Sequence, residues 1–419
     1  MAALGLILLV LAGLIIRVNA VVILLGGLAY IHLVWGDGHL EYLVEDMWIS
    51  LDNDLLLAIP MFLIAGNIMT RGSIAKRLIR VTTLLTDPLP GGMGVATILS
   101  CAIFAAISGS SPVTLLAVGS VLYPALREAG YSKSFSLGAI TSGGTLGIII
   151  PPSIPLIVYG LVTEKSIADL FIAGMIPGLL MVGALGFYSF WINRHLPSKP
   201  FDFPALILAL KEGIWSLMLP VILLAGIYSG YFSPTEAAAV ALAYGLFVEA
   251  FIHRELGIRD FFRTTVDTAV MLGMLFPIIA VALSLNTVLT IERVPHSLAD
   301  WVVSVTDSKI AFLLAVNLLL LLAGCLIDAV SAILILGPLL LAPAMAYGID
   351  PIHFGVMMVI NLEVGFLTPP IGLNLFVAMS AFRVTFLEVA RAVLPFVLII
   401  FGVLMLVTFI PGISLALLR

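Results

Sequence analysis

The fold is decided by the stretch GGTLGIIIPPSIP at residues 143–155, which lies inside a long apolar run. A second stretch, NLEVGFLTPPIG at residues 361–372, repeats the pattern 218 residues later, with a glycine, three mostly apolar residues and Pro-Pro. Two consecutive prolines remove backbone donors and clash with the preceding turn, so the carbonyls just upstream lose their helical partners. In hydrocarbon those carbonyls need partners from protein, water or an ion. Each stretch therefore predicts a transmembrane helix that is broken in mid-membrane.

The composition is that of a polytopic membrane protein. Hydrophobic residues make up 62% of the chain and charged residues 10%, and the mean hydropathy is +1.22. An average soluble domain has about 25% charged residues. No extended basic tract is present, which argues against nucleic acid as a partner, and no P-loop motif is present, which argues against an ATPase. The two cysteines, Cys101 and Cys325, lie in separate apolar runs, so a disulfide or metal site is not expected.

Hydropathy predicts an all-α protein with several short segments. The predicted helices are 2–16, 19–36, 53–70, 90–106, 113–126, 134–163, 167–193, 213–230, 236–252, 265–288, 310–326, 332–346, 354–380 and 393–411. Residues 113–126 and 332–346, at about 14 residues, are too short to cross about 30 Å of hydrocarbon. Each follows another helix after a short polar segment, so both pairs are predicted to be re-entrant hairpins.

Basic residues indicate the orientation of these hairpins. Six cations flank the first hairpin and place its open end in the cytoplasm: Arg71, Lys76, Arg77, Arg80, Arg127 and Lys133. Residues 37–54 carry six acidic residues and no Lys or Arg, so this segment is expected outside, and the balanced charges around the second hairpin also suit the outside. This topology leaves ten full spans, with both termini outside. Residues 1–16 are read as the first span and not as a removed signal.

The same assignment makes the two halves inverted repeats. A hairpin, a broken helix and a further span occur at 90–193 and again at 310–411, entering from opposite sides. Amphipathic pieces at 73–86 and 255–264 are expected along the cytoplasmic interface. The expected division is a scaffold with an interfacial helix at 1–89, transport-domain segments at 90–166 and 310–381, and scaffold helices at 167–309 and 382–419.

Five motifs in this order resemble one family over nearly the whole chain. They are IPMF with AG at 59–66, SGSSP at 108–112, the stretch 143–155, GYFSPTEAAA at 230–239 and NLEVGFLTPPIGLN at 361–374. The chain thereby resembles the large membrane (M) subunit of tripartite ATP-independent periplasmic (TRAP) transporters. The resemblance implies an elevator-type secondary transporter, driven by sodium ions, that takes up an organic acid such as a C4-dicarboxylate or sialic acid. It also implies a small four-helix membrane subunit (Q type), a periplasmic binding protein (P type) that largely selects the solute, and a bacterial or archaeal cytoplasmic (inner) membrane. This chain looks like an unfused large subunit.

The resemblance also implies two sodium sites. The first lies between Ser108, Ser110 and the carbonyls near Gly147, Ile149 and Pro152. The second, at the repeat offset, lies between Asp328 and Ser331 of the other tip and the groups around Gly365 and Thr368. A broken helix offers free carbonyls and a negative half-helix end for the cation. Half-helix N-termini at the breaks would face the substrate carboxylate.

Several polar residues have alternative roles. Candidates for substrate contact are Ser111, Thr145, Asn361, Glu363 and Asn374. Serines and glycines in transmembrane helices often serve close packing, and buried amides often fasten helices together. Glu363 either binds a ligand or pairs with a polar neighbour, and both interpretations stay open. Ser233-Pro234-Thr235-Glu236 is interpreted as a structural capping box.

Two other functions compete with this interpretation. An intramembrane hydrolase is the rival from another class, but no GxSxG motif, no histidine on a neighbouring span and no second aspartate accompany the intramembrane Ser and Asp residues. A nearer alternative is a self-sufficient sodium/dicarboxylate symporter of similar architecture that needs no binding protein.

Overall fold

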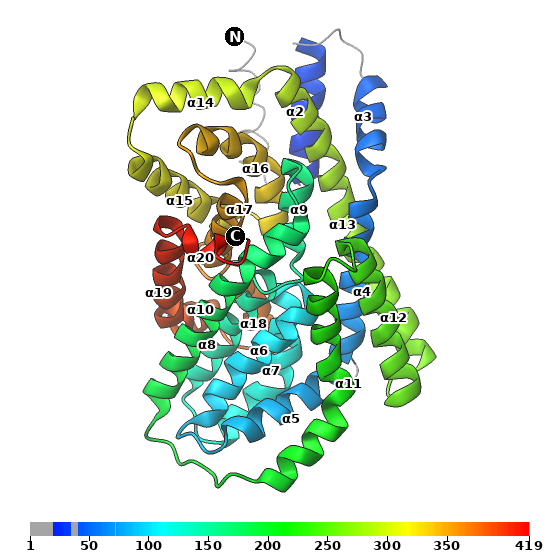
Figure 1. The fold of residues 1–419 in the computed structure, drawn as a ribbon, viewed down its shortest axis with the longest axis vertical. Coiled ribbons are helices and arrows are strands. Elements are labelled where there is room, and N and C mark those ends of the chain that lie inside the picture. The colour runs from blue at the N-terminus through cyan, green and yellow to red at the C-terminus, as the bar shows by residue number, and fades with distance from the viewer. Residues whose placement is uncertain (1–19, 35–40, 72, 419) are drawn as a thin grey trace.

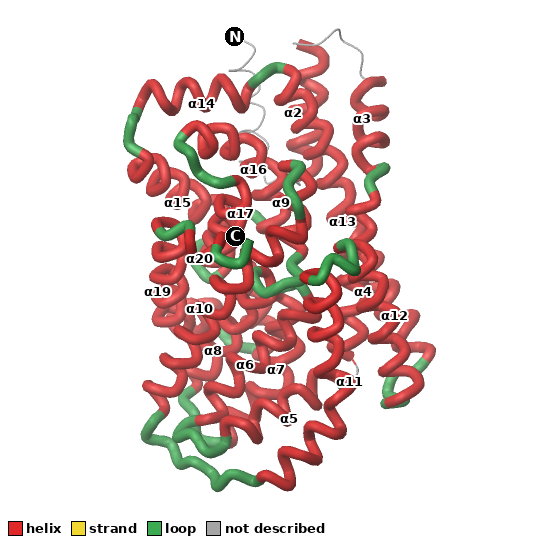
Figure 2. The backbone as a smooth tube through the Cα atoms, in the orientation of Figure 1, coloured by secondary structure: helices red, strands yellow, loops and turns green. Residues whose placement is uncertain are grey.

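A computed structural model describes residues 20–34, 41–71 and 73–418 of the chain. The predicted first helix at 2–16 lies outside the described residues. Within them, every regular element is a helix, as Figure 2 shows, and the prediction of an all-α protein is confirmed.

The described residues contain seven helices that are long and apolar enough to cross a membrane, and an eighth if one bent pair counts as a single span. The seven are α10 (Ile167–Asn193), α11 (Phe203–Tyr228), α12 with its final π turn (Pro234–Ile252), α13 (Ile258–Ile291), α15 (Lys309–Leu326), α16 (Ala329–Ala346) and α19 (Phe386–Phe409). The bent pair joins α3 (Glu41–Leu51) to α4 (Ala58–Arg71). Five of the ten expected spans correspond to single long helices, namely α10, α11, α12, α13 and α19, whereas α15 and α16 belong to the second predicted hairpin and were not among the ten. Each broken helix was counted as one span, and its separate halves are too short to qualify alone.

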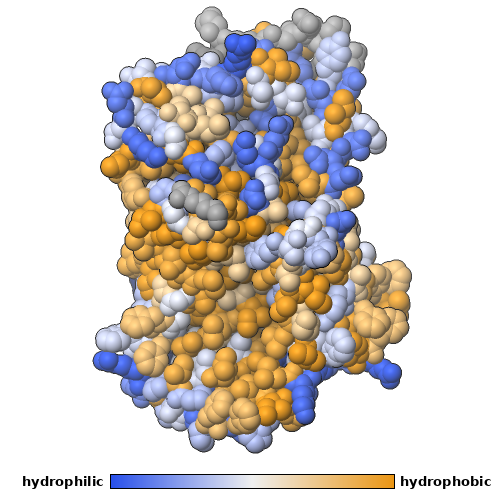
Figure 3. All heavy atoms as spheres, in the orientation of Figure 1, coloured by the Kyte–Doolittle hydropathy of each residue, from blue (hydrophilic) through white to orange (hydrophobic). Residues whose placement is uncertain are grey.

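The surface has the distribution of polarity that a bilayer requires. In Figure 3, hydrophobic residues cover most of the middle of the visible face, and hydrophilic residues gather at the top and along the lower rim. Exposed large apolar side chains such as Leu179, Phe187 and Val221 lie on α10 and α11. The chain is therefore a multi-pass membrane protein.

Two helical pairs are joined at the predicted polar tips. The first pair is α6 (Gly92–Ser108) and α7 (Ser111–Glu128), and the second is α15 and α16. The second helix of each pair has 18 residues and not about 14, because both begin within the polar tip and α7 also continues two residues past its predicted end. The argument from length was therefore wrong. The first pair lies in the lower half of Figure 1 and the second in the upper half, toward opposite ends of the molecule.

Both predicted helix interruptions are confirmed. The first broken helix consists of α8 (Lys133–Gly144), a 3-10 turn (Thr145–Ile148) and α9 (Ile154–Thr163). The second consists of α17 (Pro351–Phe366) and α18 (Leu373–Phe382). The environments of the two breaks differ, since Pro151 and Pro152 are buried whereas Pro369 and Pro370 are exposed.

Several helices differ from the predicted ones. The predicted interfacial piece at 255–264 is wrong as a separate element, because residues from 258 onward form the first turns of the long helix α13. The helices α3 and α14 (Val294–Val305) were not predicted, since their mixed polarity hides them from a search for apolar spans. The remaining described elements are α2 (Ala20–Val34), a 3-10 turn (Asp54–Leu57) and α20 (Gly412–Leu415). The Ser233–Glu236 capping box is confirmed at the start of α12.

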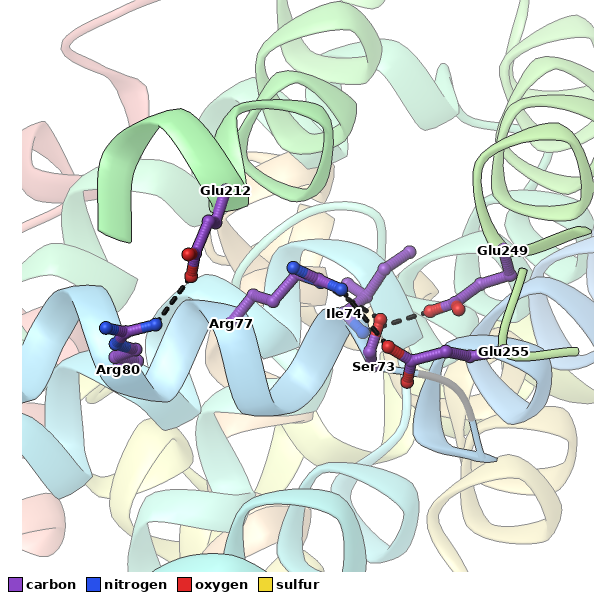
Figure 4. A network of polar contacts seen from close by, with 7 residues as sticks. All are labelled: Ser73, Ile74, Arg77, Arg80, Glu212, Glu249 and Glu255. Carbon is purple, nitrogen blue, oxygen red and sulfur yellow. Dashed lines mark hydrogen bonds and ion pairs between the residues drawn. The ribbon is translucent and has the colours of Figure 1, made fainter. Parts of the chain in front are cut away.

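The amphipathic helix α5 (Ile74–Thr86) connects α4 to the first hairpin and is held by a polar network (Figure 4). The buried Glu249, in the π turn at the end of α12, accepts a hydrogen bond from the Ile74 amide at 2.9 Å. Arg77 pairs with Glu255 at 3.1 Å, and Arg80 pairs with Glu212 at 2.5 Å. These contacts anchor α5 to α11 and α12.

Candidate functional site

A cavity of about 200 Å³ lies where both hairpin tips meet both broken helices. The first tip contributes Gly109 to Pro112, and the second contributes Asp328 to Val330. The breaks contribute Ile148, Ile154, Pro155, Phe366 and Leu373. Leu63 of α4 and Met271 and Leu275 of α13 complete the lining. Segments more than 200 residues apart thus build one site.

Four helix N-termini meet at this cavity. The first residues of α7, α9, α16 and α18 are Ser111, Ile154, Ala329 and Leu373, and all four line it. Each helix N-terminus carries the equivalent of about half a positive charge. Of the described lining residues, Asp328 alone has an ionisable side chain. The arrangement suits an anion that is bound by backbone dipoles.

The first hairpin tip packs directly onto the first break. The Ile154 amide donates to the Gly109 carbonyl at 3.3 Å. Gly109 has a φ of +59°, and a Cβ there would lie 2.9 Å from the Pro152 carbonyl oxygen. A Cβ on Gly147 would lie 2.6 Å from the Ser110 carbonyl oxygen. Gly109 and Gly147 therefore allow close contact between the tip and the break.

The predicted first sodium site is largely brought together by this packing. Ser108 is buried, and its hydroxyl lies 2.7 Å from the hydroxyl of Thr114. A Cβ on Gly147 would also lie 2.7 Å from that Thr114 hydroxyl. Thr114 was not predicted as a sodium ligand, because the sequence motif at the tip ends at Pro112. The hydroxyl and carbonyl oxygens gathered here are hard donors, which fit a sodium ion.

Ile149 faces a different neighbour. A Cβ on Gly174 of α10 would lie 2.8 Å from the Ile149 carbonyl oxygen, so this carbonyl lies against α10. The Ile148 carbonyl, also freed by the break, accepts a hydrogen bond from the Ser153 hydroxyl at 2.5 Å. Of the carbonyls predicted near Gly147, Ile149 and Pro152, that of Pro152 lies against the hairpin tip, 2.9 Å from where a Cβ on Gly109 would be.

The predicted second site is built around the other tip. Asp328 is the N-cap of α16, where its carboxylate accepts from the Ser331 amide at 3.0 Å and from the Ser331 hydroxyl at 2.5 Å. Gly365 lies against the backbone of Gly324, and Thr368 donates to the Val364 carbonyl at 2.7 Å. No hydrogen bond within the described ranges joins Asp328 or Ser331 to Gly365 or Thr368. The four residues supply oxygen atoms suited to sodium. Asp328 and Ser331 form one hydrogen-bonded group, and Gly365 and Thr368 lie in another.

Three of the predicted substrate residues form one buried cluster. The Ser111 hydroxyl donates to Glu363 Oε1 at 2.8 Å. The Asn374 amide donates to the Ser111 hydroxyl at 2.6 Å and to Glu363 Oε1 at 3.3 Å. All three side chains are at most 1% exposed, and Ser111 alone lines the cavity. Glu363 and Asn374 therefore lie behind Ser111 and orient it.

The other two predicted substrate residues lie outside the cavity lining. Thr145 donates to the Ser142 carbonyl at 2.5 Å. Asn361 donates to the side-chain oxygen of Asn317 in α15 at 2.7 Å. Asn361 thus fastens α17 to α15, which was the alternative role expected for a buried amide.

The cluster offers no support for hydrolytic chemistry. Ser111 has Glu363 and Asn374 as its partners, and within the described residues no histidine forms a hydrogen bond with Ser108 or Ser111. A Ser nucleophile requires an adjacent base that takes up its proton, most often a histidine. The arrangement fits binding and orientation of a solute.

Comparison with known proteins relates this architecture to one family. Residues 4–413 match the family model described as "Tripartite ATP-independent periplasmic transporter, DctM component". The chain is 40% identical over 393 residues to the isethionate TRAP transporter permease protein DctMQ of Oleidesulfovibrio alaskensis, covering 92% of this chain and 62% of that relative. It is 41% identical over 384 residues to the C4-dicarboxylate TRAP transporter large permease protein DctM of Rhodobacter capsulatus, covering 86% of each.

A solved structure shares the fold. The YdaH transporter of Alcanivorax borkumensis superposes with a TM-score of 0.67 at 16% identity, covering 92% of this chain and 91% of that one. The family match spans nearly the whole sequence, and the relatives are named transporter permeases. The chain therefore belongs to the DctM family, the large permease components of tripartite ATP-independent periplasmic transporters.

Proposed function

We propose that this permease takes up a small organic-acid anion across the inner membrane, driven by sodium ions. The observation that carries the proposal is the cavity at which four helix N-termini meet. A carboxylate or sulfonate placed there gains from peptide dipoles in a site of low dielectric constant, without a Lys or Arg partner among the described lining residues.

Sodium would be held at the two hairpin tips. Ser108, Thr114 and the Ser110 carbonyl supply oxygen atoms at the first tip, and Asp328 supplies a carboxylate at the second. A bound sodium ion would neutralise negative charge beside the anion. The chain's own contribution is to orient these oxygen atoms and to exclude lipid from them.

The order of the helices supports inverted repeats and an elevator mechanism. The helices α7 and α9 begin at Ser111 and Ile154, and their counterparts α16 and α18 begin at Ala329 and Leu373, 218 and 219 residues later. The two hairpins lie toward opposite ends of the molecule in Figure 1. We propose that the hairpins and broken helices move as one transport domain against a scaffold that includes α4, α10, α11, α12 and α13.

Relatives provide the candidate solutes and partners. The two relatives described above are named for isethionate and for C4-dicarboxylates, which are small organic acids. We propose the same class of solute here, delivered by a periplasmic binding protein, with a small membrane subunit as the second partner. Both termini are proposed to lie on the periplasmic side.

Reconstitution tests this function. Proteoliposomes that contain the permease and its small subunit, supplied with the binding protein, are expected to accumulate labelled succinate when an inward sodium gradient is imposed. Uptake should stop when potassium replaces sodium. Accumulation that is independent of sodium would contradict the proposed coupling.

The same preparation separates the two transporter alternatives. The tripartite system is expected to show uptake only when the binding protein is present. Equal uptake by the permease alone would identify a self-sufficient sodium/dicarboxylate symporter, because no delivery step would then be needed.

A further inference from the structure

The cavity has two chemically different walls. One wall comes from the hairpin tips and the breaks, with the four helix N-termini and Asp328. The other consists of Leu63 from α4 and of Met271 and Leu275 from α13. Met271 and Leu275 are four residues apart, so they lie on the same face of their helix. These three side chains, here called the apolar wall, offer no hydrogen-bonding group to a solute.

We propose that the apolar wall is a size filter, through which the membrane subunit itself selects short, unbranched solutes. This inference rests on the proposed function. It differs from the expectation that selection lies largely with the binding protein. It also assigns a role to α4 and α13, which contribute none of the predicted sodium or substrate residues.

The small volume of the cavity is the first argument. At about 200 Å³, the cavity is smaller than the about 300–1,000 Å³ typical of pockets for drug-sized ligands. An anionic group has its favourable position at the helix N-termini, so the carbon skeleton of the solute must face the apolar wall. A branched or bulky skeleton, such as that of sialic acid, would then collide with these side chains.

The packing of the apolar wall is the second argument. Leu63 is only 3% exposed, Met271 and Leu275 are partly buried, and α4 and α13 contact each other. Figure 1 shows the two helices on the same side of the molecule. Close-packed interiors yield little to an added methyl group, so the part of the wall formed by the buried Leu63 resists displacement, and Met271 and Leu275 add bulk beside it that a larger skeleton must displace.

The position of the apolar wall predicts which binding affinity it affects. Its three residues lie on α4 and α13, whereas the proposed sodium ligands lie on the hairpins and the broken helices. A change in the apolar wall should therefore alter the affinity for the solute and leave the affinity for sodium unaltered.

The experiment compares two solutes that differ only in bulk. The purified permease in nanodiscs is titrated with succinate and with 2,2-dimethylsuccinate, a dianion with two added methyl groups on its carbon chain, in the presence of sodium. Thermal stabilisation gives the half-maximal concentration of each. The wild type is expected to prefer succinate. Met271→Ala and Leu275→Ala are each expected to shift the ratio toward dimethylsuccinate by about tenfold or more, the range that a methylene gives in an apolar pocket.

Met274→Ala is the matched control. Met274 lies on the same helix as Met271, but it is 61% exposed and does not line the cavity. Its substitution should leave the ratio unchanged. Sodium alone should stabilise all variants at the wild-type concentration. Leu275→Val, which removes less volume, is expected to give an intermediate shift and serves if an alanine variant does not fold.

Three results would overturn the filter. They are an unchanged ratio in the folded variants of Met271 and Leu275, an equal shift in Met274→Ala, and a wild type that binds both solutes equally. A wild type that responds to sodium and to neither solute would overturn the proposed class of solute and the filter with it. A wild type that binds the solutes without any effect of sodium would contradict the sodium coupling alone, and the ratio would still test the filter.

Discussion

The hydroxyl of Ser111 donates a hydrogen bond to Glu363 Oε1 at 2.8 Å, although 252 residues separate the two positions. Ser111 begins the second helix of the first hairpin, and Glu363 lies in the second broken helix. The bond therefore joins the two halves of the chain directly beside the cavity. Together with the bond from Asn374, it gives one oxygen of this buried acidic side chain its partners.

Ser111→Ala removes a donor from a fully buried carboxylate. Loss of one partner from such a group costs about 1–3 kcal/mol, so a lower thermal midpoint is expected for the purified variant. Ser120→Ala is the control, because Ser120 lies on the same helix, is exposed and bonds only to the Ala117 carbonyl. Equal midpoints for the two variants would contradict a stabilising role for the Ser111–Glu363 bond.

Thr114→Val should weaken the response to sodium. The substitution keeps the shape of the side chain and removes the hydroxyl that lies 2.7 Å from the Ser108 hydroxyl. The sodium concentration for half-maximal thermal stabilisation is expected to rise about tenfold, as for one lost interaction of roughly 1.4 kcal/mol. Thr97→Val, which removes a hydroxyl bonded only within α6, should leave that concentration unchanged. An unaltered response in Thr114→Val would exclude this hydroxyl as a sodium ligand.

Asp328→Asn separates two roles of one side chain. Asparagine caps a helix about as well as aspartate does, so the start of α16 should remain intact. If the carboxylate also binds sodium, the half-maximal sodium concentration should rise severalfold while the midpoint without sodium changes little. A wild-type sodium response would leave Asp328 with the capping role alone.

Gly147→Ala is expected to abolish sodium-driven uptake. Its Cβ would lie 2.6 Å from the Ser110 carbonyl oxygen and 2.7 Å from the Thr114 hydroxyl, so the hairpin tip would have to move. Gly183→Ala in α10 meets no atom within 4 Å and should be neutral or stabilising by up to about 1 kcal/mol. Full uptake by Gly147→Ala would show that the tip tolerates displacement.

The network around α5 predicts an order of effects. Glu249→Ala leaves the buried Ile74 amide without its acceptor and should cost about 1–3 kcal/mol. Arg80→Ala breaks an ion pair whose side chains are 49% and 39% exposed, and should cost at most about 1 kcal/mol. Glu249→Gln, which keeps an acceptor oxygen, should fall between them. Thermal midpoints measure this order, and a larger effect of Arg80→Ala would refute it.

The parts of the fold that follow from local chemistry were predictable. Pro-Pro cannot continue a helix, and the breaks lie where Pro151 and Pro369 predict them. The capping box at Ser233 was also predictable, because it is formed by residues within one helical turn of each other. The box formed by Thr385 and Glu388 has the same sequence signature and could have been found.

The contacts between distant segments were not predictable from one sequence. The cluster of Ser111, Glu363 and Asn374 depends on how a hairpin tip packs against both halves of a broken helix. The bond between Asn361 and Asn317 depends likewise on the packing of α17 against α15. Helices of mixed polarity such as α3 were not predicted, because a search for apolar spans does not detect them.

The four helix N-termini at the cavity have a consequence for how uptake responds to acidity. Peptide dipoles carry no titratable proton, so the positive potential that they create persists across the physiological pH range. A cavity lined by lysine or histidine would lose its attraction as those groups gave up their protons. If the solute binds at these termini as proposed, their attraction for it is the same in acidic and alkaline surroundings, and Asp328 is the one described lining residue whose charge can change with pH.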